Sequence, residues 1–318
     1  MPDPTKPARK SSEARPGAGE MFLRHVFGWL YIKALAWIRR APVATEWARA
    51  RPLARLFSAP EDILTRRNVP LVFDEPTARR VNEQRLDYHV RLTTDIARML
   101  RAGPAGILSR AKVTGVEHLE AAISEKKGVL LVSAHAGTWW HAPAVVASLG
   151  HPVSSVLTRF LPGSIVRYLE EVARELHCSL TFVRMGAYEA ARAAFRKGEV
   201  FFLSFDFASR SDRSMTMPIG ESAEFLVDTG PGVMAVRHQI PVVWVDTFHD
   251  EAGRSCIRFL PAIHAGRGTD YPKTESVLHY FMDRLNDQVA SHPEQWWLLG
   301  HGFMHQRPAP VLPTSDIP

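Results

Sequence analysis

The sequence contains little cysteine and no recognisable export signal. Among its 318 residues only Cys178 and Cys256 are cysteines, too few for a disulfide framework or a four-thiolate zinc site. The amino terminus lacks the charged start, apolar core and small-residue cleavage site of a signal peptide. We therefore expect a protein of a reducing, cytosolic compartment. With 46% hydrophobic and 23% charged residues, the chain has enough apolar material for a large globular domain, which excludes a disordered or fibrous protein.

Three kinds of catalytic motif are also missing. The chain has no glycine loop ending in Gly-Lys-Ser/Thr, no nucleophile elbow around a serine, and no histidine pair spaced for a helical zinc site. His135 and His141 come closest to such a pair, but they lack a third ligand and the four-residue spacing. These absences argue against nucleotide hydrolysis, serine hydrolysis and zinc catalysis. The sequence therefore predicts neither a metal nor a cofactor.

Positive charge is concentrated near the amino terminus. The chain carries a net charge of +6, and residues 21–67 alone hold nine Lys or Arg against three acidic residues. The remainder is close to neutral, which argues against a nucleic-acid-binding surface and predicts no nucleic-acid partner. We divide the chain into a disordered tail (residues 1–20), a basic helical segment (21–67), a helical lead-in (68–104), an α/β domain (105–302) and a C-terminal tail (303–318).

The basic segment has the composition of a helix that lies on a membrane surface. Residues 21–38 are apolar and aromatic, but Arg24, His25 and Lys33 interrupt them, and a spanning helix needs about 20 mostly apolar residues. Trp and Tyr side chains favour headgroup depth, and basic side chains are attracted to anionic lipid. We therefore expect a peripheral contact with an anionic membrane surface. The alternative is a helix packed on the domain with a solvated basic edge.

From residue 105 onward, short apolar runs alternate with helical patterns. This alternation predicts an α/β fold with a mostly parallel central sheet flanked by helices. A helical pattern over residues 77–101 precedes it and is expected to end at Gly103-Pro104. We expect strands at residues 112–116, 128–134, 152–158, 179–183, 199–205 and 240–248, a further strand at 256–260, and helices at 139–149, 163–177, 187–197, 229–238 and 274–291.

Polar side chains directly follow several of these strands. Ligands of an open parallel sheet bind beyond the carboxyl ends of its strands, so the residues found there are candidates for a site. Chance is the competing explanation, because strand ends are polar in most proteins. The candidates are His135, Arg159, Arg184, Asp206 and Arg210.

His135 is the sharpest candidate. It ends an apolar strand, Gly137 permits a close backbone approach, and a helix is expected to begin nearby, whose first N–H groups could hold an oxyanion or a phosphate. A histidine in such a place can act as a general base. A lone histidine is more often structural, and that alternative stays open here.

Several segments, in order, give residues 105–300 a resemblance to the bacterial lipid A biosynthesis acyltransferase family. The last of them, HPEQWW, matches the closing signature of the family well, and the coincidence of all of them in the correct order is a strong signal. The segments are residues 113–119 (VTGVEHL), 128–139 (GVLLVSAHAGTW), 201–206 (FFLSFD), 217–220 (MPIG), 229–235 (TGPGVMA) with 240–243 (IPVV), and 292–297 (HPEQWW).

The resemblance implies an enzyme that moves a fatty acyl chain from a thioester of acyl carrier protein or CoA to a hydroxyl or amine of a lipid or lipid-like acceptor. It implies a peripheral protein on the cytoplasmic face of the inner membrane, with His135 as the base. Arg159, Arg184 and Arg210 would suit the phosphates of a carrier arm or a lipid head group. Each of these arginines is, taken singly, more often a solvated charge.

The chain departs from the family pattern beside the expected base. Members of the family normally carry Asp or Glu five positions after the histidine, and that acid orients the imidazole, whereas this chain has Trp140 there. We expect the side chain of Trp140 to line the binding site for the acyl chain or the acceptor. Asp206 is the candidate replacement acid, since it alone among the acids directly follows a neighbouring strand. The alternative is a catalytically degenerate member that binds acyl chains or carrier protein as an accessory or scaffold.

Overall fold

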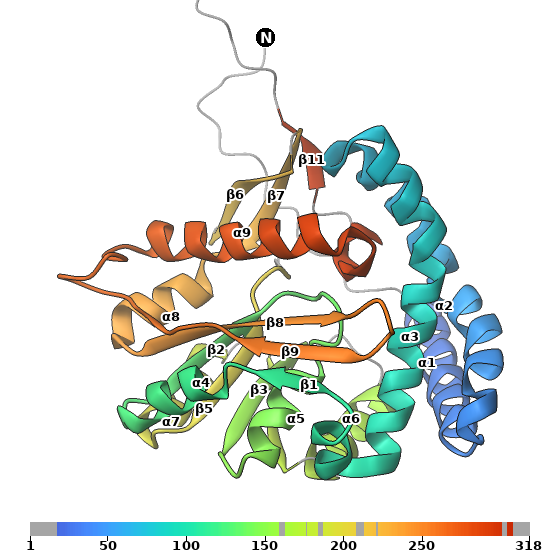
Figure 1. The fold of residues 1–318 in the computed structure, drawn as a ribbon, viewed down its shortest axis with the longest axis horizontal. Coiled ribbons are helices and arrows are strands. Elements are labelled where there is room, and N and C mark those ends of the chain that lie inside the picture. The colour runs from blue at the N-terminus through green and yellow to red at the C-terminus, as the bar shows by residue number, and fades with distance from the viewer. Residues whose placement is uncertain are drawn as a thin grey trace, which may run out of the picture.

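A mostly parallel sheet forms the centre of the structure, a computed structural model that describes residues 18–158, 163–175, 177–183, 187–207, 213–220, 222–300 and 304–307 (Figure 1). The strand order is β1-β9-β8-β2-β5-β3-β4, with β10 paired to β8. Neighbouring strands are parallel except where β8 meets β9 and β10. The strands are β1 (Lys112–Thr114), β2 (Val129–Ser133), β3 (Val153–Thr158), β4 (Cys178–Val183), β5 (Val200–Ser204), β8 (Pro241–His249), β9 (Ser255–Phe259) and β10 (Ile263–His264).

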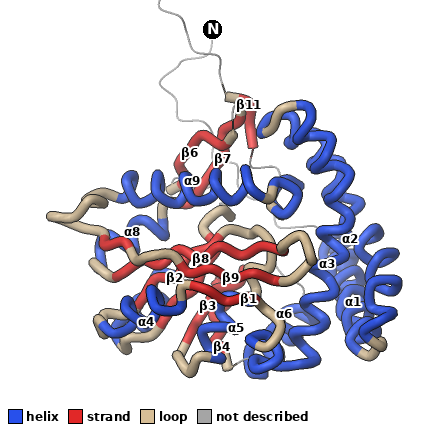
Figure 2. The backbone as a smooth tube through the Cα atoms, viewed as in Figure 1, coloured by secondary structure: helices blue, strands red, loops and turns tan. Residues whose placement is uncertain are grey.

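Helices cover both faces of this sheet, which confirms the predicted α/β class (Figure 2). Three long helices, α1 (Ala18–Arg39), α2 (Val43–Val72) and α3 (Glu75–Leu108), stand together at one side of the molecule. Two short 3₁₀ helices, η1 (Pro293–Gln295) and η2 (Trp297–Gly300), follow the last long helix. The remaining helices are α4 (Val116–Ser124), α5 (His141–Ser148), α6 (Gly163–Glu175), α7 (Ala187–Arg196), α8 (Gly230–His238) and α9 (Thr274–Ser291).

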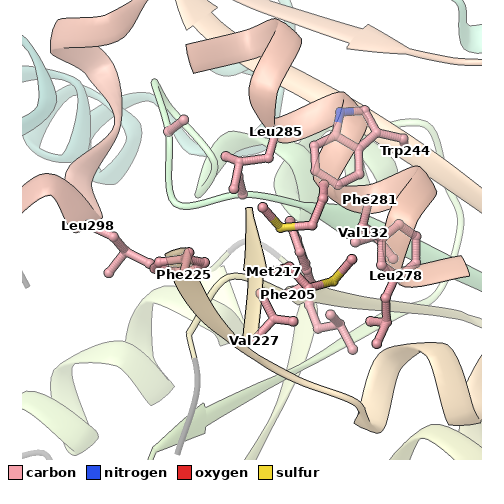
Figure 3. Close-up of a cluster of buried hydrophobic side chains, with 14 of the residues drawn as sticks. Val132, Phe205, Met217, Phe225, Val227, Trp244, Leu278, Phe281, Leu285 and Leu298 are labelled. Carbon is pink, nitrogen blue, oxygen red and sulfur yellow. The ribbon is translucent and has the colours of Figure 1, made fainter. Parts of the chain in front are cut away.

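The central strands are buried on both faces, and their side chains pack alternately into two separate hydrophobic cores. Leu130 and Val132 of β2 join the core that includes residues of α7, α8 and α9. Figure 3 shows Val132 in this core together with Leu278 and Phe281 of α9. Val129 and Leu131 of the same strand join the core that includes residues of α4, α5 and α6. Strands of a parallel sheet that is covered on both sides read as continuous apolar runs for this reason. The apolar runs at residues 128–134 and 199–205 were therefore the clearest strand signals in the sequence.

A second, smaller sheet was missed from the sequence. Its strands are β6 (Ser214–Ile219), β7 (Ala223–Asp228) and β11 (Met304–Gln306), in the order β11-β7-β6. Residues 217–219, which belong to one of the segments that carry the family resemblance, end β6, where Met217 pairs with Phe225. Pro218 is compatible with this strand because β6 lies at the edge of the sheet. Met217 and Ile219 alternate with exposed neighbours, which is the period-two signal that could have found the strand.

Three expected boundaries also differ from the structure. α3 continues through Gly103-Pro104 to Leu108, because its packing against the neighbouring helices outweighs the low helix propensity of those two residues. α1 begins at Ala18, inside the expected disordered tail, while residues 1–17 lie outside the described part of the chain. β11 lies in the expected C-terminal tail, where it gains the hydrogen bonds of a strand by pairing with β7.

Candidate active site

The register of two central strands brings His135 and Asp206 together. β2 and β5 are parallel neighbours in which Ser133 pairs with Ser204. His135 and Asp206 each lie two residues beyond that pair, so both leave the sheet at the same carboxyl edge. The backbone bond from the N–H of Phe205 to the carbonyl of Ser133, at 3.0 Å, holds the two strand ends side by side.

Asp206 is fully buried and accepts every hydrogen bond that the structure gives it. Nδ1 of His135 lies 2.7 Å from Asp206 Oδ1, and the backbone N–H of His135 lies 2.9 Å from Oδ2. The indole N–H of Trp296 donates to Oδ2 at 2.9 Å. A carboxylate in this place acts as an acceptor, so the shared proton resides on Nδ1 of His135. Nε2 of His135 consequently keeps a lone pair and is free to take a proton.

The imidazole of His135 lies among aromatic rings. Its side chain is 18% exposed, and its ring centroid lies 5.3 Å from that of Trp139, 5.7 Å from Trp297 and 5.9 Å from Phe207. Phe207 is itself 42% exposed. These rings leave the histidine partly accessible and give its surroundings an apolar wall, which suits a hydrocarbon chain.

Trp140 occupies the position of the acid expected from the resemblance, and its aromatic partner in the structure is Trp139. Its ring stacks on Trp139 with centroids 5.0 Å apart, and Trp139 in turn stacks on Trp297 at 5.8 Å. The indole N–H of Trp140 is buried and has no hydrogen-bond partner among the described residues. The side chain therefore packs behind Trp139, in the cluster that includes Tyr88 and Leu92.

Gly137 serves the packing of this loop. Its φ of +55° is left-handed, and a Cβ added there would collide with the carbonyl of Thr247 on β8. Its carbonyl accepts a hydrogen bond from the hydroxyl of Tyr88, and its N–H donates to Gln295. The close backbone approach expected at Gly137 thus exists, and it is an approach to β8.

The first N–H groups of α5 do not meet the expectation of an oxyanion site. The N–H of His141 donates to Thr138 at 2.8 Å and that of Ala142 to Trp139 at 3.2 Å, so the turn that precedes the helix already occupies them. Arg159, Arg184 and Arg210, the three arginines expected at the strand ends, lie outside the described residues.

The sequence did not single out the closing HPEQWW segment as part of the site, yet it lies directly against the histidine loop. Trp296 forms an antiparallel bridge with Ala136, and the N–H of Trp297 donates to the carbonyl of His135 at 2.8 Å. Arg85 of α3, which is buried, donates to the carbonyls of Trp296 and Trp297, both at 2.7 Å. The signal that could have found this contact is the pair of adjacent tryptophans in a polar stretch.

A second polar cluster lies beside the site, between α3, α5 and the β8–β9 turn. His249 Nε2 lies 2.6 Å from Asp95, and His141 Nδ1 lies 2.9 Å from the hydroxyl of Ser255. Burial lowers the pKa of His141, although the charge of Asp95 opposes the shift. Burial alone would raise the pKa of Asp95, but the hydrogen bond and charge of His249 outweigh it and lower that pKa.

A cavity of about 510 Å³ opens next to this cluster and is lined by charged side chains, among them Arg98 and Arg254. Arg98 pairs with buried Glu46 at 2.6 Å, and Arg254 pairs with Asp250 at 2.9 Å. These ion pairs offset much of the positive charge around the cavity. Its lining mixes these charged groups with apolar side chains such as Val43 and Met99.

Fold and site together define the class of the protein: an α/β protein with a buried acid–histidine pair at the carboxyl edge of its central sheet. A family model described as bacterial lipid A biosynthesis acyltransferase matches residues 20–304. The chain therefore belongs to that family, which implies acyl transfer to a lipid acceptor. Comparison with the curated proteins finds no match. Within the described residues, no cluster of three or more His, Cys, Asp or Glu is arranged to hold a metal ion.

Buried histidines near the site make stability depend on pH. Burial lowers the pKa of His89 to about 3, with the charge of Arg85 adding to the effect. The unfolded chain binds a proton at His89 below about pH 6.5 while the folded chain does not, so stability falls as pH drops from 6.5 toward 3. We expect about 2 kcal/mol of unfolding free energy to be lost at pH 5 relative to pH 8 from this group alone. Urea unfolding at several pH values measures the loss, and His89→Gln should reduce it; an equal slope in the variant would contradict the assignment.

Proposed function

We propose that this protein transfers a fatty acyl chain from a thioester of acyl carrier protein or CoA to a hydroxyl or amine of a lipid acceptor, with His135 as general base. The observation that carries the proposal is the hydrogen bond from Nδ1 of His135 to buried Asp206. This bond orients the ring and leaves Nε2 as the basic atom, which is the arrangement that base-assisted nucleophilic attack requires.

The pair supports a balanced acyl transfer. Nε2 of His135 takes the proton of the acceptor hydroxyl as its oxygen attacks the thioester carbonyl carbon. The tetrahedral intermediate collapses by breaking the carbon–sulfur bond, and the imidazolium returns the proton to the leaving thiolate. Asp206 remains ionised throughout and stabilises the positive charge that His135 carries between these steps.

The surroundings of the pair support a hydrocarbon substrate. Trp139, Trp297 and Phe207 give the imidazole apolar neighbours, so an acyl chain laid against them loses contact with water. The two cysteines form no disulfide, which is compatible with the reducing cytoplasmic side of a membrane. Burial raises the pKa of Cys178 to about 12, so this thiol is unsuited to hold the acyl chain as a covalent intermediate.

Removal of either member of the pair should abolish most of the transfer. We expect His135→Ala and Asp206→Asn each to lower turnover on the order of 10²- to 10⁴-fold. The first variant lacks the base, and the amide of the second can no longer stabilise the imidazolium. The measurement uses labelled acyl carrier thioesters with a membrane lipid extract. If the two residues act as one unit, the double variant loses no more than the worse single variant.

Two results of that assay would contradict the assignment. Activity of Asp206→Asn within a few fold of the wild type would remove Asp206 as the orienting acid. A folded wild type that is inactive with carrier-protein and CoA donors alike would favour the alternative of a degenerate member that binds acyl chains or carrier protein without catalysis.

Trp140 should be replaceable by another aromatic residue but not by the acid of the family pattern. Trp140→Phe keeps the stack on Trp139 and should leave turnover within about threefold of the wild type. Trp140→Glu buries a carboxylate among aromatic rings while Nδ1 of His135 is already bonded to Asp206, so it should lower stability without raising turnover. Thermal unfolding and the acyl-transfer assay test both variants. A gain of activity in Trp140→Glu would show that Asp206 does not satisfy the histidine.

We further propose that α1 and α2 hold the protein peripherally on the anionic cytoplasmic face of the inner membrane. Along α1, Val26, Trp29, Leu30, Lys33 and Trp37 are exposed and share one face of the helix by their spacing. No described helix is long and apolar enough to cross a bilayer. An exposed stripe of aromatic and aliphatic side chains with a lysine in it suits insertion at headgroup depth.

Basic side chains accompany the exposed tryptophans. Lys33 lies over the ring of Trp29 at 5.6 Å and Arg49 over Trp37 at 4.7 Å. The charge of such residues adds roughly 1 kcal/mol each near an anionic surface, and this attraction is screened by salt. The surface thus combines the two attractions that a peripheral protein needs.

Substitution of the two exposed tryptophans of α1 should weaken membrane binding. We expect Trp29→Ser/Trp37→Ser in the full chain to lower partitioning into vesicles containing phosphatidylglycerol at least about tenfold, because both indoles leave water on insertion. Vesicle sedimentation measures the effect. Val233→Ser on α8, which removes an exposed apolar side chain elsewhere, is the matched control. Equal loss in both variants, or failure of alkaline carbonate to release the wild type, would contradict the proposal.

A further inference from the structure

Trp296 joins three segments that are far apart in the sequence. Its backbone bridges Ala136 in the histidine loop, and its fully buried indole donates its N–H to Oδ2 of Asp206 at 2.9 Å. Asp206 follows β5, and Trp296 follows η1. A single side chain from the closing segment therefore touches the carboxylate that also binds His135.

The indole N–H bond is separable from the packing of the ring. The ring packs edge-on against Phe225 with centroids 5.3 Å apart, a contact that another aromatic side chain could make. The N–H, in contrast, points at one oxygen of a buried carboxylate. A hydrogen bond to a charged acceptor is stronger than one between neutral groups, so this bond draws electron density from the carboxylate that His135 shares.

The position of Trp296 is itself fixed from outside the sheet. Arg85 of α3 donates to the carbonyl of Trp296 and to that of Trp297, and it is buried. Asn68 of α2 donates to the carbonyl of Leu299 at 2.9 Å. The indole therefore approaches Asp206 from a segment that two long helices hold in place.

We propose that Trp296 is a positioning residue that sets how strongly Asp206 pulls on the Nδ1 proton of His135. This inference rests on the proposed function, in which His135 is the general base. Without the indole N–H, the carboxylate accepts one hydrogen bond fewer and its negative charge is less dispersed. Asp206 then pulls harder on the proton of Nδ1, and the imidazolium is more strongly stabilised.

The test compares two buried tryptophans that each donate to a carboxylate. Trp296→Phe removes the bond to Asp206, and Trp244→Phe removes a comparable bond of 2.7 Å from Trp244 to Asp246, a carboxylate that binds Arg258 and not His135. Both indoles are fully buried in the same core. The probe is the imidazole Nδ1–H proton resonance of His135 in full-length protein labelled with ¹⁵N-histidine, assigned by its absence in His135→Ala.

We expect Trp296→Phe to move this resonance downfield while Trp244→Phe leaves it in place. We also expect the acidic limb of the pH–rate profile to move up by about one pH unit, which is a loss of about tenfold in rate at its acidic end and none on the plateau above the limb. A resonance that is unchanged in Trp296→Phe, or that moves upfield, overturns the proposal. If Trp296→Phe does not fold, Trp296→Met, which also lacks the N–H, takes its place. A shifted resonance in a protein without transfer activity would uphold the positioning role and refute the proposed function.

Discussion

The buried carboxylate of Asp206 is the constraint on which the rest of the site depends. A charge without access to water is stable only when donors surround it, and here the donors come from two other segments of the chain. The histidine loop supplies two of these groups and the closing segment supplies the third. The carboxylate therefore fixes the relative positions of the end of β2, the end of β5 and the turn after α9, and the orientation of His135 follows from it.

Only some of the groups that contact Asp206 could be predicted from the sequence. His135 and Asp206 could be paired in advance, because both directly follow apolar runs that read as neighbouring parallel strands, and the structure places them at the same offset from the Ser133–Ser204 pair. Trp296 could not be placed in this way. It reaches the carboxylate through a single backbone bridge to Ala136, and no periodicity in the sequence reports an isolated bridge.

For the fold, the predictable part was the part buried on both faces. The apolar runs of β2, β5 and β8 and the helical patterns between strands gave the α/β class, since burial leaves a continuous apolar signal. The small sheet of β6, β7 and β11 was missed because one strand contains Pro218 and another comes from the chain end. The continuation of α3 past Gly103-Pro104 cannot be predicted from local propensity, because the packing of three long helices outweighs it.

The hydrogen bonding of His135 also explains why the fold tolerates a tryptophan at position 140. Nδ1 of an imidazole carries one proton and can satisfy one carboxylate, and Asp206 already holds that place. A carboxylate at position 140 would place a charge in the aromatic cluster of Trp139, Trp297 and Tyr88, where the cost of ionisation is high. An aromatic side chain at position 140 avoids this cost and extends the stack that supports the ring next to the histidine. A tryptophan at position 140 and a bonded His135 are thus compatible within one fold, because the carboxylate that binds Nδ1 comes from the end of β5.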